Sequence, residues 1–196
     1  MAEMKSAWER AMERVEGLGK ATDTERLQWK YVPEGEALAV GLLKEDRNLV
    51  AELARYEESA RQYVVQGAQQ VLLKNIDLPK NDFVKKNTRK AMDSLKTLKK
   101  DKTPVENIYS KMRRIFSHYE QEGAQQRRQA FEALKQDFQA KLAQAVRQQY
   151  GTTAAPNVNV ETHPQFQEEW RRIQVQLDSQ YYRLLEEFKQ ELQRIS

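Results

Sequence analysis

The sequence predicts an all-α protein: an elongated helical bundle built on two very long antiparallel helices, with a long C-terminal helix and short N-terminal helices. Three observations predict this class. Helix-capping motifs recur along the chain, and apolar residues repeat at helical spacings for tens of residues. The apolar content is low, with 39% hydrophobic against 32% charged residues. That balance suits a thin bundle, because each of its helices buries only one stripe.

Short helices are expected over residues 5–31. Two capping boxes, Ser6-Ala-Trp-Glu9 and Thr22-Asp-Thr-Glu25, mark their starts. Gly17 is expected to end the first of them, because glycine readily adopts the left-handed conformation found at helix C-termini.

A long helix is expected over about residues 33–76, opened by Pro33 at its first position. Two apolar series run through it with a spacing of eleven residues: Leu38, Leu49, Ala60 and Val71, and Leu42, Leu53 and Val64. An eleven-residue period keeps one stripe on a nearly straight helix. At 1.5 Å per residue this helix reaches about 65 Å.

The segment Asp77-Leu-Pro-Lys80 breaks the chain, and a basic helix follows over about residues 81–100. Thr103-Pro-Val-Glu106 then starts a helix over residues 104–150, about 70 Å long. The polar stretch from Gly123 to Gln129 predicts a kink or a polar layer inside it.

A loop at residues 151–163 precedes the C-terminal helix at 164–195. Three series of eleven-residue spacing are filled there without exception: Phe166, Leu177 and Phe188; Trp170, Tyr181 and Leu192; Ile173, Leu184 and Ile195. Such a stripe indicates packing on another helix. A compact chain of 196 residues has a radius of gyration of about 16 Å. Such a globule is too small to contain straight helices of about 65–70 Å. We therefore expect one elongated domain over residues 1–196.

Positive charge is concentrated in residues 80–118, which hold 12 basic and 4 acidic side chains. The candidate nucleic-acid-binding residues are Lys80, Lys85, Lys86, Arg89, Lys90, Lys96, Lys99, Lys100, Lys111, Arg113 and Arg114. Lysine outnumbers arginine, which favours diffuse attraction to phosphates over base reading. The alternatives are a solvated face, docking on the acidic N-terminal segment, an acidic protein partner or, more weakly, an anionic membrane surface.

No motif for catalysis stands out. The absence of cysteine excludes thiolate catalysis, zinc–thiolate sites and iron–sulfur clusters. Gly17-Leu-Gly-Lys20 fails as a phosphate loop, because Arg14 stands five residues before Gly19 where the pattern needs a glycine, and Ala21 follows Lys20 where it needs Ser or Thr. Neither His118 nor His163 has the Glu three residues earlier that bundle di-iron sites use, and His163 is expected to serve the first turn of the helix after it. No enzyme, cofactor, metal site or small-molecule substrate is therefore predicted.

Five strings together carry a resemblance: Ser6-Ala-Trp-Glu-Arg-Ala-Met-Glu-Arg-Val15, Trp29-Lys-Tyr-Val-Pro-Glu-Gly35, Asn75-Ile-Asp-Leu-Pro-Lys-Asn81, Asn107-Ile-Tyr-Ser-Lys-Met-Arg-Arg-Ile-Phe116 and Pro164-Gln-Phe-Gln-Glu-Glu-Trp170. With them the chain resembles an uncharacterised bacterial family of all-helical proteins with no assigned function. The resemblance implies a bacterial cytosolic setting and one undivided domain, and it carries over no site residues.

The expected function is that of a non-enzymatic scaffold or adaptor, acting through helix-face contacts with a protein partner or with a second copy in a homodimer. Glutamines between Gln125 and Gln149 form either a solvated face or a polar seam against a second subunit. The alternative is a nucleic-acid-associated protein that uses the basic patch, and a third option is an enzyme assembled from scattered helix residues. No secretory signal is expected at the N-terminus and no membrane-spanning run is present, so the expected location is cytoplasmic.

Overall fold

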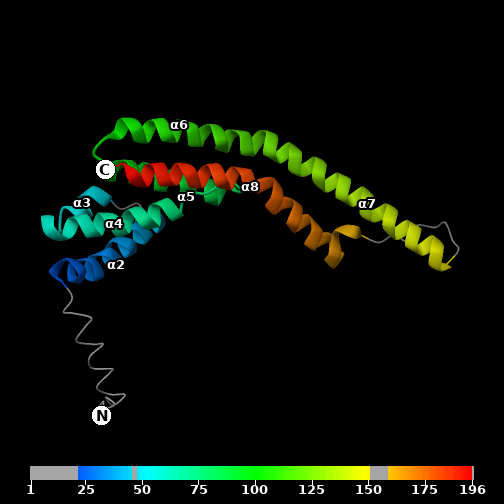
Figure 1. Ribbon diagram of the computed structural model, residues 1–196, viewed down its shortest axis with the longest axis horizontal. Helices are drawn as coiled ribbons and strands as arrows, with labels where there is room; N and C mark the ends of the chain where they lie inside the picture. Colours follow the sequence, from blue (N-terminus) through cyan, green and yellow to red (C-terminus); the bar gives the residue numbers. More distant parts are fainter. Residues whose placement is uncertain (1–21, 46–47, 151–158, 196) are drawn as a thin grey trace, which may run out of the picture. The chain divides into compact units, whose positions relative to one another are not determined.

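The computed structural model describes residues 22–45, 48–150 and 159–195, and every regular element in these ranges is a helix (Figure 1). This confirms the all-α class. The chain divides into two compact units, Met1–Val71 and Leu72–Ser196, which we describe separately. The helix expected near the N-terminus, before residue 22, lies outside the described residues.

In the first unit the predicted continuous helix over residues 33–76 is wrong. The chain forms α2 (Asp23–Lys44), the short α3 (Leu49–Leu53) and α4 (Glu58–Lys74), whose last residues belong to the second unit. The capping box at Thr22 is present, with the Glu25 N–H donating to the Thr22 hydroxyl at 3.2 Å. The helix that it opens does not end near residue 31, because it continues through Pro33. That proline lies on the exposed side of α2, where water can reach the carbonyl group that lacks its helical donor.

Local hydrogen bonds explain the two turns. The Asn48 side chain accepts from the N–H groups of Val50 and Ala51 at the start of α3. The Arg61 guanidinium donates to the carbonyl oxygens of Leu53 and Tyr56, just before α4. The eleven-residue stripe nevertheless marks core positions, since Leu42, Leu49, Leu53, Ala60 and Val64 are all buried. Leu38 and Val71, at the two ends of the stripe, are half-buried. The stripe therefore marks most core positions correctly and predicts continuity wrongly.

Two glycines bring α2 and α4 into backbone contact. A Cβ atom at Gly35 would overlap the carbonyl oxygen of Val64, and one at Gly67 would overlap that of Val32. Because 35 faces 64 and 32 faces 67, the two helices run antiparallel at this crossing. Only residues without a side chain allow so close an approach.

The second unit begins with a loop that is fixed to the helix after it. Buried Thr88 accepts a hydrogen bond from the Asp77 N–H at 3.0 Å and donates one to the Asp77 carbonyl at 3.1 Å. Helix α5 (Asp82–Leu98) is the predicted basic helix, capped by Asn81. Its apolar arc is buried at Ala91 and Leu95.

The long helix predicted over residues 104–150 is present as three joined pieces: α6 (Lys102–His118), the π-helical turn η1 (Tyr119–Gly123) and α7 (Ala124–Tyr150). Its cap is Asp101, which accepts from the Thr103 N–H at 3.0 Å, so it starts two residues earlier than expected. The irregularity predicted between Gly123 and Gln129 lies in the π-helical turn that ends at Gly123.

Helix α8 (Pro164–Arg194) runs antiparallel to this long helix, as Figure 1 shows, and elongates the second unit. It follows a short 3₁₀ turn, η2 (Val160–Thr162), while residues 151–158 of the predicted loop lie outside the described ranges. His163 caps α8, as expected, by accepting from the Gln165 N–H.

Aromatic pairs along the antiparallel helices hold them together. Phe131 packs edge-on against Trp170, with ring centroids 5.0 Å apart, and Phe138 packs against Phe166 at 5.5 Å. Phe166 and Leu192 of the predicted stripe are buried, whereas Leu184 is 42% exposed. No helix in the described part of the chain is long and apolar enough to cross a membrane.

Candidate functional site

The fold distributes the predicted basic patch over a loop and two helices. Lys80 precedes α5, six of the other residues lie between Lys85 and Lys99 on α5 and its C-terminal cap, Lys100 follows, and Lys111, Arg113 and Arg114 lie on α6. Five of them line one groove of about 810 Å³ between α5 and α6: Lys85, Lys86, Arg89, Lys96 and Arg113. We call it the α5–α6 groove.

The α5–α6 groove is not uniformly basic. Four carboxylates line it beside the five cations: Asp82, Asp93, Glu106 and Glu120. Lys85 pairs with Glu120 at 2.6 Å, and both Lys96 and Arg113 pair with Glu106. These two partners lower the pKa of Glu106 by hydrogen bonding to its charged form. The ion pairs leave much less charge for phosphates than the sequence suggests.

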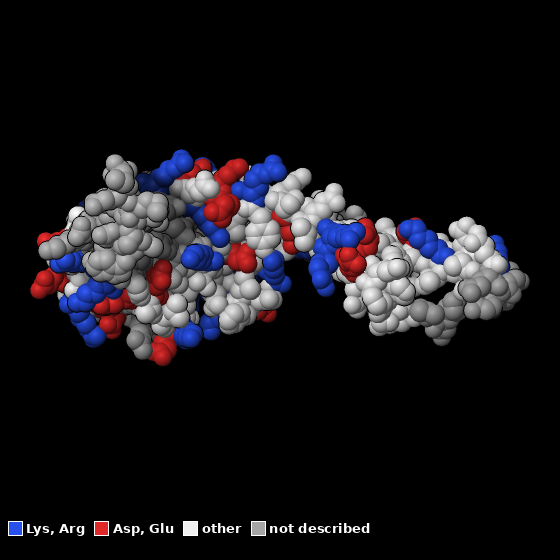
Figure 2. Space-filling model, turned by 60° about the horizontal axis from the view of Figure 1, so that its bottom comes forward, with Lys and Arg blue, Asp and Glu red and all other residues white. Residues whose placement is uncertain are grey.

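Other residues of the predicted patch have local roles. Lys99 is buried and donates to the Ile195 carbonyl oxygen beyond the end of α8, and burial lowers its pKa. Lys111 pairs with Glu191 at 3.5 Å. Lys86, Arg89 and Lys100 are exposed. On the face drawn in Figure 2, blue and red side chains are interspersed, without a continuous basic surface.

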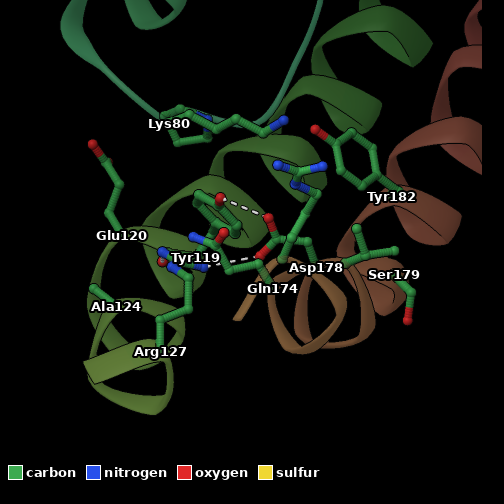
Figure 3. A pocket seen from close by; sticks show the side chains of 12 residues that line it. Lys80, Tyr119, Glu120, Ala124, Arg127, Gln174, Asp178, Ser179 and Tyr182 are labelled. Atoms are coloured by element: carbon green, nitrogen blue, oxygen red, sulfur yellow. Dashed lines mark hydrogen bonds and ion pairs between the residues drawn. The ribbon is translucent and has the colours of Figure 1, made fainter. Parts of the chain in front are cut away.

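A largely buried polar network, which we call the π-turn network, lies at the π-helical turn and consists of Tyr119, Arg127 and Asp178. The Asp178 carboxylate accepts from the Tyr119 hydroxyl at 3.2 Å and pairs with Arg127 at 3.1 Å, as the dashed lines in Figure 3 show. The Arg127 guanidinium also donates to the Tyr119 carbonyl oxygen at 3.1 Å and lies 4.0 Å from its ring centroid. Burial raises the pKa of Tyr119 to about 12, so its hydroxyl remains a proton donor.

Beside the π-turn network, His118 Nδ1 and the Tyr181 hydroxyl are 2.8 Å apart. Gly123 makes room for this tyrosine, since a Cβ atom there would lie 3.1 Å from the Tyr181 hydroxyl oxygen. The π turn thus links the long helix to α8 through polar contacts. Such turns occur frequently at functional sites.

Two hollows flank α8 at this level. The first, of about 730 Å³, we call the Tyr182 cleft. It is lined by Pro79, Lys80, Tyr119, Glu120, Ala124, Arg127, Arg171, Gln174, Val175, Asp178, Ser179 and Tyr182. Figure 3 shows Lys80 and Tyr182 extending over it from the loop and from α8.

The second hollow, of about 650 Å³, we call the Leu184 groove. It is lined by Arg114, Ile115, His118, Gln126, Gln176, Leu177, Gln180, Tyr181 and Leu184. Nine residues separate Leu184 from Val175 of the Tyr182 cleft, which at 100° per residue places them on opposite sides of α8. Its lining combines three aliphatic side chains and three amides with His118, Tyr181 and the cation Arg114, and it includes no carboxylate.

Sequence reasoning missed the π-turn network and both hollows. The weak polar stretch from Gly123 to Gln129 indicated an irregular place in the long helix, but not which residues of α8 lie opposite it. Among the described residues no group of three His, Asp or Glu side chains could hold a metal ion.

No curated protein and no solved structure matches the chain. A family model, described as a family of unknown function, DUF6657, matches residues 50–194. The match covers the end of the first unit and nearly all of the second, including the α5–α6 groove, the π-turn network and both hollows beside α8. It agrees with the expected membership of an all-helical family without an assigned function. The chain belongs to this family of unknown function, DUF6657.

Proposed function

We propose that the protein is a non-enzymatic helical scaffold that acts through helix-face contacts, and that it associates with a second copy through the Leu184 groove. The exposure of Leu184 supports this most directly. The other residues of the eleven-residue series on α8 are buried or half-buried, whereas Leu184 is 42% exposed. It lies beside Leu177 and Ile115 in an open groove. Exposed leucine in a groove between two helices is typical of surfaces that accept a further helix.

The groove is complementary to itself. Leu177 and Leu184 lie three and four residues on either side of Gln180. If two α8 helices meet antiparallel with the twofold axis between Gln180 and Tyr181, Leu177 of each copy faces Leu184 of the other. The Gln180 amide can both donate and accept, so the Gln180 side chains of the two copies can hydrogen-bond to each other across the twofold axis.

The composition of the surroundings also favours a helix partner. Exposed glutamines continue along α7 at Gln125, Gln126, Gln129, Gln136, Gln139, Gln144 and Gln148. They supply hydrogen-bonding groups without adding charge to the surface that would face a second copy. We assign these glutamines to the polar seam against a second copy, which the sequence left open as an alternative to a solvated face.

Sedimentation equilibrium tests the proposal. The wild-type chain is expected to form dimers in the micromolar range, and Leu184→Glu is expected to weaken them at least about tenfold, because two buried carboxylates would face the apolar seam. Val175→Glu is the matched control: it makes the same kind of change at a residue that is 67% exposed on the opposite side of α8. A wild-type chain that remains monomeric at about 100 μM, or equal effects of both variants, would contradict the proposal.

The second candidate is nucleic-acid binding, and it is favoured by one specific observation. Phe83 is 73% exposed at the start of α5, one helical turn from Lys86 and two from Arg89. Within residues 22–45, 48–150 and 159–195 neither cation forms an ion pair. An exposed aromatic ring beside free cations can stack on a base while the cations contact phosphates.

Fluorescence anisotropy of labelled mixed-sequence DNA and RNA at two salt concentrations tests this candidate. Binding should weaken steeply with salt, and the double variant Lys86→Gln/Arg89→Gln should lower affinity and flatten the salt dependence. Lys141→Gln on α7, at an exposed lysine paired with Asp137, is the control. Absence of binding at low salt would rule out the candidate.

A further inference from the structure

The Tyr182 cleft has the dimensions of a small-molecule site. Its volume of about 730 Å³ falls in the range of ligand pockets, about 300–1,000 Å³. Three parts of the second unit meet there: the loop before α5, the π turn with the start of α7, and α8 (Figure 3). Binding of a ligand here is independent of the association proposed above, because the Leu184 groove is on the other side of α8.

One side of the cleft is rigid. The carboxylate of Asp178 and the side chain of Arg127 are only 14% and 20% exposed, and each makes further hydrogen bonds or ring contacts with Tyr119. The loop that carries Lys80 is held by Thr88, which bonds both backbone polar groups of Asp77. The lining is therefore preorganised, which reduces the cost of ordering it on binding.

The carboxylates at the cleft are already compensated. Asp178 is paired with Arg127, and Glu120 is paired with Lys85 from α5. Asp77, near Lys80, accepts from the Leu78 N–H at 2.7 Å. Burial raises the pKa of the Tyr182 hydroxyl, and the neighbouring Asp77 carboxylate raises it further.

Not every cation that lines the cleft is paired with a carboxylate. Arg171 lines the cleft and has no ion pair in the part of the chain that the structure describes. Lys80 lies 5.0 Å from the Tyr182 ring centroid, and the pKa of its amino group is raised by the Tyr182 hydroxyl and by the nearby charges of Asp77 and Asp178. The balance of the lining thus favours an added negative charge, and Arg171 can present two parallel N–H donors to it.

We propose that the Tyr182 cleft binds a small organic anion, a phosphate monoester or carboxylate attached to a flat apolar group. Arg171 and Lys80 hold the anionic end. The ring of Tyr182 and the side chains of Val175 and Pro79 cover the apolar part, and Gln174 and Ser179 offer polar contacts at its edge. Tyr182 and Val175 are 36% and 67% exposed, so a ligand in the cleft would remove apolar surface from water.

Isothermal titration of the full chain with phenyl phosphate, benzoate and inorganic phosphate tests the proposal. Phenyl phosphate or benzoate should bind saturably with a dissociation constant of about 1 mM or lower, and inorganic phosphate several-fold more weakly. Arg171→Gln should weaken the organic anion about tenfold through the loss of a charged hydrogen-bonding partner. Arg172→Gln is the matched control, because the next residue on α8 pairs with Glu168 at 2.6 Å and does not line the cleft.

Tyr182→Leu separates the two halves of the site. It should weaken phenyl phosphate more than inorganic phosphate, because only the former contacts the ring. The proposal is overturned if none of the three probes binds saturably up to about 10 mM, if Arg171→Gln and Arg172→Gln have equal effects, or if inorganic phosphate binds as tightly as phenyl phosphate. Circular dichroism of each variant verifies that the helices are intact.

Discussion

At the scale of single residues, Arg127 shows how one side chain joins two helices. It compensates Asp178 of α8, bonds the carbonyl of Tyr119 in the π turn and covers the Tyr119 ring. Removing one partner of a mostly buried ion pair costs more than the pair contributes, since it leaves the other charge without compensation.

Arg127→Met is accordingly expected to lower the free energy of unfolding by about 2–3 kcal/mol, as measured by guanidinium denaturation. The double variant Arg127→Met/Asp178→Leu should recover part of this loss, because no buried charge is left unpaired. Arg128→Met, at the exposed neighbour, should change stability by less than about 0.5 kcal/mol. Equal losses for the two single variants would show that the π-turn network does not stabilise the fold.

Lys99 provides a pH-dependent test. Burial lowers the pKa of this lysine in the folded state from its usual 10.5. As the pH rises toward 10.5, the unfolded chain therefore binds more protons at this residue than the folded chain, so its contribution to the free energy of unfolding increases with pH. Relative to Lys99→Met, the wild type should gain stability between neutral pH and about pH 9.5. Parallel stability profiles for the two proteins would contradict the assignment.

At the scale of elements, the crossing of α2 and α4 depends on the absence of two side chains. Gly67→Ala raises helix propensity by about 1 kcal/mol, yet its Cβ atom would overlap backbone atoms of Val32 and Glu36, which cannot rotate away. We expect a net loss of about 1–3 kcal/mol, as for other overpacked interiors.

Hydrogen exchange localises that effect to α2 and α4. Gln66→Ala, at the exposed neighbouring residue, is the control and should be neutral within about 0.5 kcal/mol. If Gly67→Ala were as stable as the wild type, with unchanged protection in both helices, the close crossing would be wrong.

The elements also show what the sequence could predict. Capping signals and apolar periodicity give α5, the long helix from α6 to α7 and α8 nearly to the residue. The same periodicity fails at residues 45–57, because an eleven-residue stripe suits a straight helix and an antiparallel pair equally well. Asn48 was an available capping signal for the turn, whereas the backbone contact at Gly35 and Gly67 is tertiary and leaves no local pattern.

At the scale of the whole molecule, burial and pairing decide which predicted site residues remain available. The basic patch is real in the sequence, but three of its cations form ion pairs with Glu106 and Glu120, and Lys99 is buried. Glu106 lies on α6 and Glu120 on the π-helical turn, and the sequence does not show that these residues lie beside α5. The Tyr182 cleft and the Leu184 groove could not be predicted either, since each needs residues more than forty positions apart in the chain.

Site-specific crosslinking tests the proposed scaffold most directly. The chain has no cysteine, so a single introduced cysteine reports only its own position. Gln180→Cys, next to the expected twofold axis, should form a disulfide between two copies under mild oxidation. Glu186→Cys, exposed on α8 and outside both hollows, should not. A Gln180→Cys chain that stays monomeric at concentrations of about 100 μM, or that crosslinks no faster than Glu186→Cys, would contradict association through the Leu184 groove.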